Sequence, residues 1–485
     1  MNIPKKYPSW NDVVHAVRRY RPSDFLPALA LAAYSLQGKP FSSMRKYYNQ
    51  WAIAALARES ILYGTEDRDR EVTVQAINRT LFTFDQADFS QGIKGKPLYL
   101  AMGSFLYEQY KFQLSSEHEI ARTYLLFCDP ELQVDRSKAP DRDWSQVFDM
   151  PLEERLESIR LIEAATFLHH GIIPIVELEA LGRQPEADQN VVKNMMRTVE
   201  DLTATIQEAR DSAKNVPLVP DYLKRFSFNP LERFPIINIG KSSLLVPQPF
   251  YLLRTLSVGN LFYRGCEVFG SAFPSELGYR VEAYVGMQLG YAEFDHVLPE
   301  IDYGTTSPKL SVDWFAMAGD TVLLIECKSA KLSQHVLSGE PSKTEDLLKR
   351  SVGKAREQIK NTSELINGGH EKFNKIPSNM NQIGLIVTAE PIYCANDSNF
   401  HEGLTNPNIP CLSISLDDLE SLAALGAGRM VEVLSAVLDG PNRETWNVRD
   451  TIRQHFSKEE SLPKNLLDDA YKRFQAARGQ KLINS

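Results

Sequence analysis

The chain has 485 residues, 43% of them hydrophobic and 24% charged, which is ordinary for a soluble protein of roughly two to four domains. Its net charge of −8 argues against a protein that is basic throughout, although a local basic groove is compatible with it. The longest apolar run, residues 25–34, is too short to span a bilayer, so we expect no membrane partner.

Other compositional features predict a cytoplasmic protein. No apolar stretch follows the charged N-terminus, so we expect no signal peptide. The five cysteines are scattered and form no C-x-x-C pair, which indicates a reducing compartment and no structural zinc. The chain also lacks the G-x(4)-G-K-[ST] loop of NTPases and the G-x-S-x-G elbow of α/β-hydrolases.

Residues 1–215 are predicted to form a helical domain, because apolar residues recur there at helical spacing. The expected helices cover 10–20, 23–38, 42–63, 70–83, 96–114, 119–128, 151–170 and 185–214. The pattern leaves open whether this domain serves regulation, targeting or assembly.

Residues 216–270 are predicted to be a linker or bridge that packs on the domain after it. The stretch opens at a proline-rich segment, followed by a hairpin at 234–246 and a helical pattern at 251–269. At the other end, 426–485 is expected to form a C-terminal helical segment with helices near 431–438, 448–456 and 464–478. That segment would cover a sheet, bind a partner or mediate dimerisation.

The chemistry is expected on a β-hairpin at 311–328. Two runs of strand-forming residues flank Gly319-Asp320, which is a two-residue turn signal. This turn sets Asp313 opposite Glu326, and strand alternation puts Lys328 on the same face. Because facing carboxylates destabilise an apolar sheet, they call for a positive partner. Their oxygens are hard ligands that suit Mg²⁺, while a solvated surface cluster is the common alternative.

Asp313, followed thirteen residues later by Glu326-Cys327-Lys328, resembles the PD-(D/E)xK signature of the restriction-endonuclease-like nuclease superfamily. The spacing is most similar to Mrr-type and Holliday-junction-resolvase-type members. The flanking sequence predicts the element order of that superfamily within 271–425. The expected elements are a helix at 277–289, strands at 296–303, 311–318 and 321–328, a helix at 343–365 and a strand at 383–388. A further strand at 411–414 and a helix at 416–425 would follow.

The expected fold class is therefore a multidomain α+β, α/β protein. It would have an N-terminal all-helical domain, a restriction-endonuclease-like α-β-β-β-α-β core and C-terminal helices.

The resemblance implies a role for each matching residue. Asp313 and Glu326 would be the metal carboxylates, the Cys327 carbonyl a further ligand, and Lys328 the catalytic lysine. Glu282 occupies the place where many members carry a glutamate on the first helix, which would make it a further metal residue, although it is equally compatible with a surface acid paired with Arg280 or another base. Gln358 falls where members often carry a polar residue near the active site.

Basic residues around the predicted site suit contact with a nucleic-acid backbone, although a solvated amphipathic helix is the alternative. We expect such contacts from Lys331, Lys349, Arg350, Lys354, Arg356 and Gln358. The resemblance implies a metal-dependent DNA endonuclease using Mg²⁺, with Mn²⁺ as an alternative, in restriction or anti-phage defence. Partner proteins of a defence system and a homo-oligomer are compatible with it. Alternatives are a non-cutting protein that binds nucleic acid or a partner, and a junction-specific resolvase.

Overall fold

The computed structural model describes residues 7–36, 49–87, 94–112, 115–180, 185–212, 221–240, 242–329, 331–440, 448, 452, 454 and 465–483. The chain is a mixed α/β protein with a four-stranded and a five-stranded sheet in these ranges. It divides into two compact units, one made of residues 1–116, 143–261 and 337–339, and the other of residues 117–142, 262–336 and 340–485. None of the described helices is both long and apolar enough to cross a membrane.

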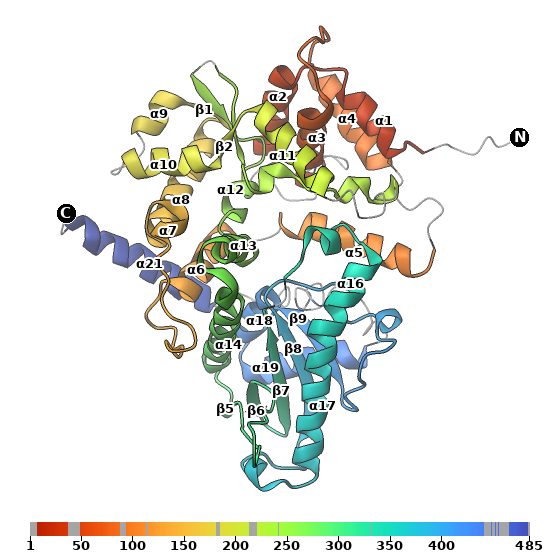
Figure 1. The fold of residues 1–485 in the computed structure, drawn as a ribbon, viewed down its shortest axis with the longest axis vertical. Helices are drawn as coiled ribbons and strands as arrows, with labels where there is room; N and C mark the ends of the chain where they lie inside the picture. The colour runs from red at the N-terminus through yellow and green to blue at the C-terminus, as the bar shows by residue number, and fades with distance from the viewer. Residues whose placement is uncertain are drawn as a thin grey trace, which may run out of the picture. The chain divides into compact units, whose positions relative to one another are not determined.

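The first unit combines helices with the four-stranded sheet, whose strand order is β1-β4-β3-β2 (Figure 1). Its α-helices are α1 (Trp10–Val17), α2 (Pro22–Ser35), α3 (Gln50–Tyr63), α4 (Val74–Gln86), α5 (Lys96–Tyr110), α7 (Ser145–Phe148), α8 (Leu152–Leu168), α9 (Ile175–Ala180), α10 (Pro185–Met195), α11 (Val199–Ser212) and α12 (Phe250–Arg254). Its strands are β1 (Ile172–Pro174), β2 (Met196–Arg197), β3 (Ile236–Asn238) and β4 (Ser243–Leu245).

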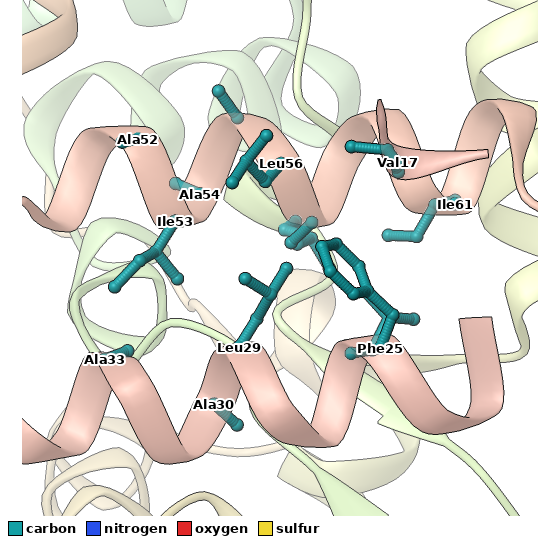
Figure 2. Packing of buried hydrophobic residues seen from close by; sticks show 14 of the residues in the cluster. Val17, Phe25, Leu29, Ala30, Ala33, Ala52, Ile53, Ala54, Leu56 and Ile61 are labelled. Carbon is teal, nitrogen blue, oxygen red and sulfur yellow. The ribbon is translucent and has the colours of Figure 1, made fainter. Parts of the chain in front are cut away.

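The core of the first unit forms where α2 and α3 pack together. Phe25 and Leu29 of α2 and Ile53 of α3 point into the space between the two helices (Figure 2). All three side chains are fully buried. Burial of each such side chain contributes roughly 1.5–3 kcal/mol, which is how an apolar helical stripe stabilises the unit.

The structure corrects three expectations for this part of the chain. The range 1–215 is not all-helical, because β1 and β2 lie within it. The single helix expected over 185–214 is interrupted at β2, which pairs in parallel with β3. The hairpin expected at 234–246 is confirmed, but it completes the sheet of the first unit instead of forming a separate bridge. These pairings join residues far apart in sequence, which helical periodicity cannot reveal.

The second unit contains the five-stranded sheet, in the order β5-β6-β7-β8-β9. Its strands are β5 (His296–Pro299), β6 (Trp314–Ala318), β7 (Thr321–Lys328), β8 (Asn381–Thr388) and β9 (Cys411–Ser415). Its helices are α14 (Phe273–Tyr291), α16 (Pro341–Leu348), α17 (Lys354–Asn367), α18 (Leu416–Ala423), α19 (Ala427–Asp439) and α21 (Leu466–Ile483), and α6 (Ser116–Phe127) belongs to it from residue 117 onward. Helices α13 (Val258–Phe269) and α15 (Gln334–Leu337) run across the division.

The order helix, three antiparallel strands, helix, parallel strand is confirmed within the predicted range. The helix expected over 343–365 is divided by a π-helical turn at Lys349–Gly353. Helices α14 and α17 lie on opposite sides of the sheet (Figure 1). Trp314 reaches α14, where it donates to the backbone oxygen of Glu282 at 2.9 Å, whereas Lys328 reaches Gln358 on α17. Central strands β7 and β8 are therefore covered on both faces, as their apolar sequences require.

Residues 117–142 belong to the second unit, although the predicted division at 215 put them with the N-terminal helices. Arg122 of α6 is buried and forms ion pairs with Glu119 and with Glu420 of α18. Arg280 of α14 is also buried, and donates to the backbone oxygens of Leu126 and Pro140. Buried guanidinium groups need such partners, so this polar network ties the segment to the second unit.

One buried carboxyl group in the first unit makes stability depend on pH. Glu163 of α8 is buried and accepts a hydrogen bond from Ser116 at 3.0 Å. Burial raises the pKa of its carboxyl from 4.5 to about 7, despite the opposing effects of Ser116 and Arg160. The folded state therefore binds more protons than the unfolded state between these two pH values, and stability falls as pH rises through that window.

We expect Glu163→Gln to abolish this pH dependence. The wild type and the variant should have similar melting temperatures at pH 5, while the variant should be more stable at pH 8 by about 1–3 kcal/mol. Calorimetry at both pH values measures the difference. The matched substitution at the exposed Glu71, Glu71→Gln, should change neither value. Equal melting of wild type and Glu163→Gln at pH 8 would show that the carboxyl is not desolvated.

Candidate active site

The hairpin has the predicted register. Trp314 pairs with Ile325 and Ala318 with Thr321, and Gly319 takes a positive φ of 57° in the turn, as a tight hairpin requires. This ladder ends at the pair of Trp314 and Ile325. Asp313 and Glu326 are the next residues at that end, and repulsion from Asp313 raises the pKa of Glu326, so the two carboxyl groups lie close together as predicted.

A β-bulge lies at this end of the sheet, between β5 and β6. Pro299 pairs with Trp314, and Ser311 donates its backbone N–H to Ile301. Two residues, Val312 and Asp313, therefore lie opposite the single residue Glu300. Such a bulge bends a strand and redirects its side chains. Here the Asp313 carboxylate accepts a hydrogen bond from the backbone N–H of Cys327 at 2.6 Å.

Helix α17 satisfies the backbone groups that the bulge leaves without a strand partner. Val312 donates its N–H to the Thr362 hydroxyl at 3.1 Å, and the Gln358 side-chain amide donates to the backbone oxygen of Ser311 at 3.3 Å. Buried peptide groups need such partners. Gln358 and Thr362 are one helical turn apart, so one face of α17 fixes the segment that leads into Asp313.

The same glutamine orients the predicted lysine. The Lys328 ammonium donates to Glu326 Oε1 at 2.5 Å and to Gln358 Oε1 at 3.3 Å. Glu326 is 2% exposed, and its second oxygen, Oε2, is buried and has no hydrogen-bond partner among the residues that the structure describes. A buried carboxylate oxygen left in this way costs free energy unless a proton or a cation occupies it.

Four carboxyl groups share the site: those of Glu282, Glu300, Asp313 and Glu326. Burial is the largest cause that raises the pKa of each of them. Repulsion from Asp313 adds to the rise at the other three. The pKa of Glu282 reaches about 7 and that of Glu326 about 8, although Lys328 partly offsets the rise at Glu326. Full ionisation of the four carboxyl groups is therefore unfavourable unless positive charge is added at the site.

The donor set fits a hard divalent cation. Carboxylate oxygens completed by water are the ligands that Mg²⁺ takes, and Glu326 Oε2 is an orphaned oxygen beside Asp313. Within the described ranges, no group of three or more His, Cys, Asp or Glu side chains is arranged so that it could hold a metal ion as it is. Asp313 and Glu326 each use an oxygen on a protein donor, Cys327 N–H and Lys328 respectively. Cation binding would therefore compete with these two contacts.

The remaining predicted residues divide into three groups. Glu282 and Gln358 lie at the site. Arg280 donates to Leu126 and Pro140, and its alternative pairing with Glu282 is not found among the described residues. Arg356 donates to the backbone oxygen of Thr405, and Lys331 lies over the Phe262 ring, so both have structural contacts. The side chains of the third group are exposed: Lys349, Arg350 and Lys354. Of these, Lys354 lies one helical turn before Gln358 on α17.

Glu300 is a site residue that the sequence did not reveal. It follows β5 directly and lies beside Asp313 because of the bulge. The hairpin turn sets the register between β6 and β7, but the connection from β5 to β6 has no turn of defined length. The sequence feature that could have indicated Glu300 is its position as a glutamate directly after an apolar strand.

Comparison of the chain with protein-family models, with curated proteins and with solved structures finds no significant match. The site must therefore be argued from its own geometry.

We expect the wild type to bind Mn²⁺, which is measured directly by electron paramagnetic resonance of the free ion. Asp313→Asn and Glu326→Gln should each weaken binding at least about tenfold, because each removes a charged oxygen donor. Glu371→Gln, at an exposed acid in the turn before β8, is the matched control and should bind like wild type. Equal Mn²⁺ affinity in all four proteins would contradict the assignment.

Proposed function

We propose that the chain is a metal-dependent endonuclease that hydrolyses phosphodiester bonds in DNA. The observation that carries the proposal is the buried, unpartnered Oε2 of Glu326, next to Asp313 and to an ordered lysine. The arrangement resembles the PD-(D/E)xK site, and the confirmed order of elements in the second unit supports a restriction-endonuclease-like core. The choice of DNA and a setting in restriction or anti-phage defence rest on that resemblance, whereas the cytoplasmic location rests on the composition and the scattered cysteines.

Each residue has a distinct task in the proposed reaction. Asp313 and Glu326 would hold Mg²⁺ or Mn²⁺, with Glu282 and Glu300 close enough to act on its water ligands. A bound cation supplies Lewis-acid polarisation of the phosphate and lowers the pKa of water. Water adds to phosphorus, the bond from phosphorus to one ester oxygen breaks, and that oxygen leaves with a proton.

Lys328 would stabilise the negative charge that develops on the phosphate. Its ammonium is half-buried and held by Glu326 and Gln358, so little reorganisation is needed when charge develops. The contact from Gln358 also fixes Ser311, which precedes the bulge. A single amide group therefore couples the position of the lysine to the position of the Asp313 segment.

We expect purified wild type to cut supercoiled plasmid, linear duplex or single-stranded DNA in Mg²⁺ or Mn²⁺ but not in EDTA. Lys328→Ala and Asp313→Ala should each lower the rate about a hundredfold or more, because the first removes a positive charge beside the phosphate and the second removes a ligand of the cation. Lys372→Ala is the matched control for lysine. It changes an exposed lysine in the segment that precedes β8. Strand β8 begins beside Thr321, which lies at the opposite end of β7 from Lys328.

Two outcomes would contradict the proposal in different ways. Cutting that survives both Lys328→Ala and Asp313→Ala would move the reaction away from the hairpin. A wild type that binds DNA in a gel shift and never cuts with either metal would favour the non-cutting alternative.

Gln358→Ala tests the coupling between helix α17 and the site. We expect kcat to fall about tenfold with little change in KM, because Gln358 positions Lys328 and Ser311 and need not touch DNA. Gln358→Glu keeps an acceptor for Lys328 but loses the donor to Ser311, so it should recover part of the rate. A change in KM alone would indicate that Gln358 contacts substrate.

A further inference from the structure

The loop 128–142 comes from the part of the chain expected to be a separate helical domain, yet it lies against α14. Arg280 is 4% exposed and donates to the backbone oxygens of Ala139 at 3.3 Å and Pro140 at 2.8 Å. Arg142 forms a two-bond contact with the buried Glu276. Two guanidinium groups therefore hold the end of the loop on the helix that carries Glu282.

The tip of the loop is a rigid turn that presents a lysine. Asp135 accepts hydrogen bonds from both the backbone N–H and the hydroxyl of Ser137, and its backbone oxygen accepts from Lys138 and Ala139. These contacts fix the backbone of the turn. Lys138 is exposed, and its ammonium lies 5.0 Å from the centre of the Tyr279 ring. Stacking on the ring positions the lysine without neutralising it.

This position brings the lysine next to the carboxylate cluster. Tyr279 and Glu282 are three residues apart on α14, so their side chains are neighbours on one helix face. The positive charge of Lys138 also lowers the pKa of both Glu282 and Glu300, against the larger effect of burial. Lys138 therefore lies beside the site on the side of α14, with its ammonium exposed to solvent. Lys328 lies on the side of α17, where it contacts Gln358.

We propose that the 128–142 loop is part of the nucleic-acid-binding surface and that Lys138 contacts a backbone phosphate beside the scissile one. The inference rests on the proposed nuclease function and adds to it a substrate contact from outside the predicted core. An exposed ammonium next to an acidic metal site compensates the repulsion that these carboxylates exert on a polyanion. Lys138 is thereby a binding residue and takes no part in bond breaking.

The test is the salt dependence of DNA affinity, measured by fluorescence anisotropy of a labelled duplex. Binding is measured with Mn²⁺ in the Lys328→Ala background, which the proposed function makes inactive. Lys138→Ala should weaken affinity about three- to tenfold at low salt, and should reduce the slope of log K against log salt by about 1, as expected for one lost phosphate contact. Lys138→Arg, which keeps the charge, should restore both values.

Two further variants make the comparison sharper. Lys372→Ala, which changes an exposed lysine in the 3-10 helix before β8, should alter neither affinity nor slope. Tyr279→Ala removes the ring beneath Lys138 and should give an intermediate loss of affinity, because the charge remains but is no longer held in place.

The competing role for Lys138 is that of a counter-ion for the carboxylates. In that case Lys138→Ala would leave DNA affinity and its salt slope unchanged while lowering the Mn²⁺ concentration needed for half-saturation, and this result would overturn the proposal. Absence of any DNA affinity in the wild type would overturn it as well.

Failure of this inference is distinguishable from failure of the proposed function. Wild-type cleavage with no effect of Lys138→Ala on affinity or slope rejects the contact and leaves the nuclease standing. DNA binding that depends on Lys138, in a chain that never cuts, supports the contact and rejects the nuclease.

Discussion

A buried carboxylate with one oxygen unpartnered is unstable without a proton or cation, and the second unit is arranged around such a group at Glu326. Strand β7 is covered by α14 on one face and α17 on the other, so solvent cannot relieve the charge. In the part of the chain that the structure describes, Lys328 is the cation that pairs with Glu326, while Asp313 adds repulsion. Cation binding would relieve this repulsion. A purely structural salt bridge between Glu326 and Lys328 would not explain why Asp313 lies beside them.

The bulge before β6 links this electrostatic arrangement to the backbone. It moves Asp313 out of the regular ladder, so that its carboxylate reaches the Cys327 N–H, and it places Glu300 beside Asp313. The bulge in turn depends on α17, since Thr362 and Gln358 partner the backbone of Val312 and Ser311. Position of the carboxylates and orientation of the lysine are therefore set by the same helix face.

Local chemistry made the hairpin predictable. A two-residue turn determines the register of β6 on β7, which the structure has, and this register brings Asp313 and Glu326 to one end of the hairpin. Features that depend on contacts between residues far apart in the chain could not be predicted from the sequence. Strand β2 is two residues long and pairs with a strand about forty residues away, and Glu300 reaches the site through a bulge in a connection without a defined turn. The position of Lys138 depends on Arg280, which holds the loop mainly through the backbone oxygens of Ala139 and Pro140, and such contacts leave no trace in a residue pattern.

If this acidic chain acts on a polyanion as proposed, its cations have to be placed by geometry, because its net charge of −8 gives no general attraction. Two lysines lie beside the carboxyl groups: Lys328, held by Glu326 and Gln358, and Lys138, held over the face of Tyr279. The contact with Tyr279 leaves the charge of Lys138 uncompensated, whereas Glu326 partly compensates that of Lys328. Residues 117–142 join the second unit through buried arginines, so a loop distant in sequence can be as well placed for phosphate contact as the strands that carry the acids.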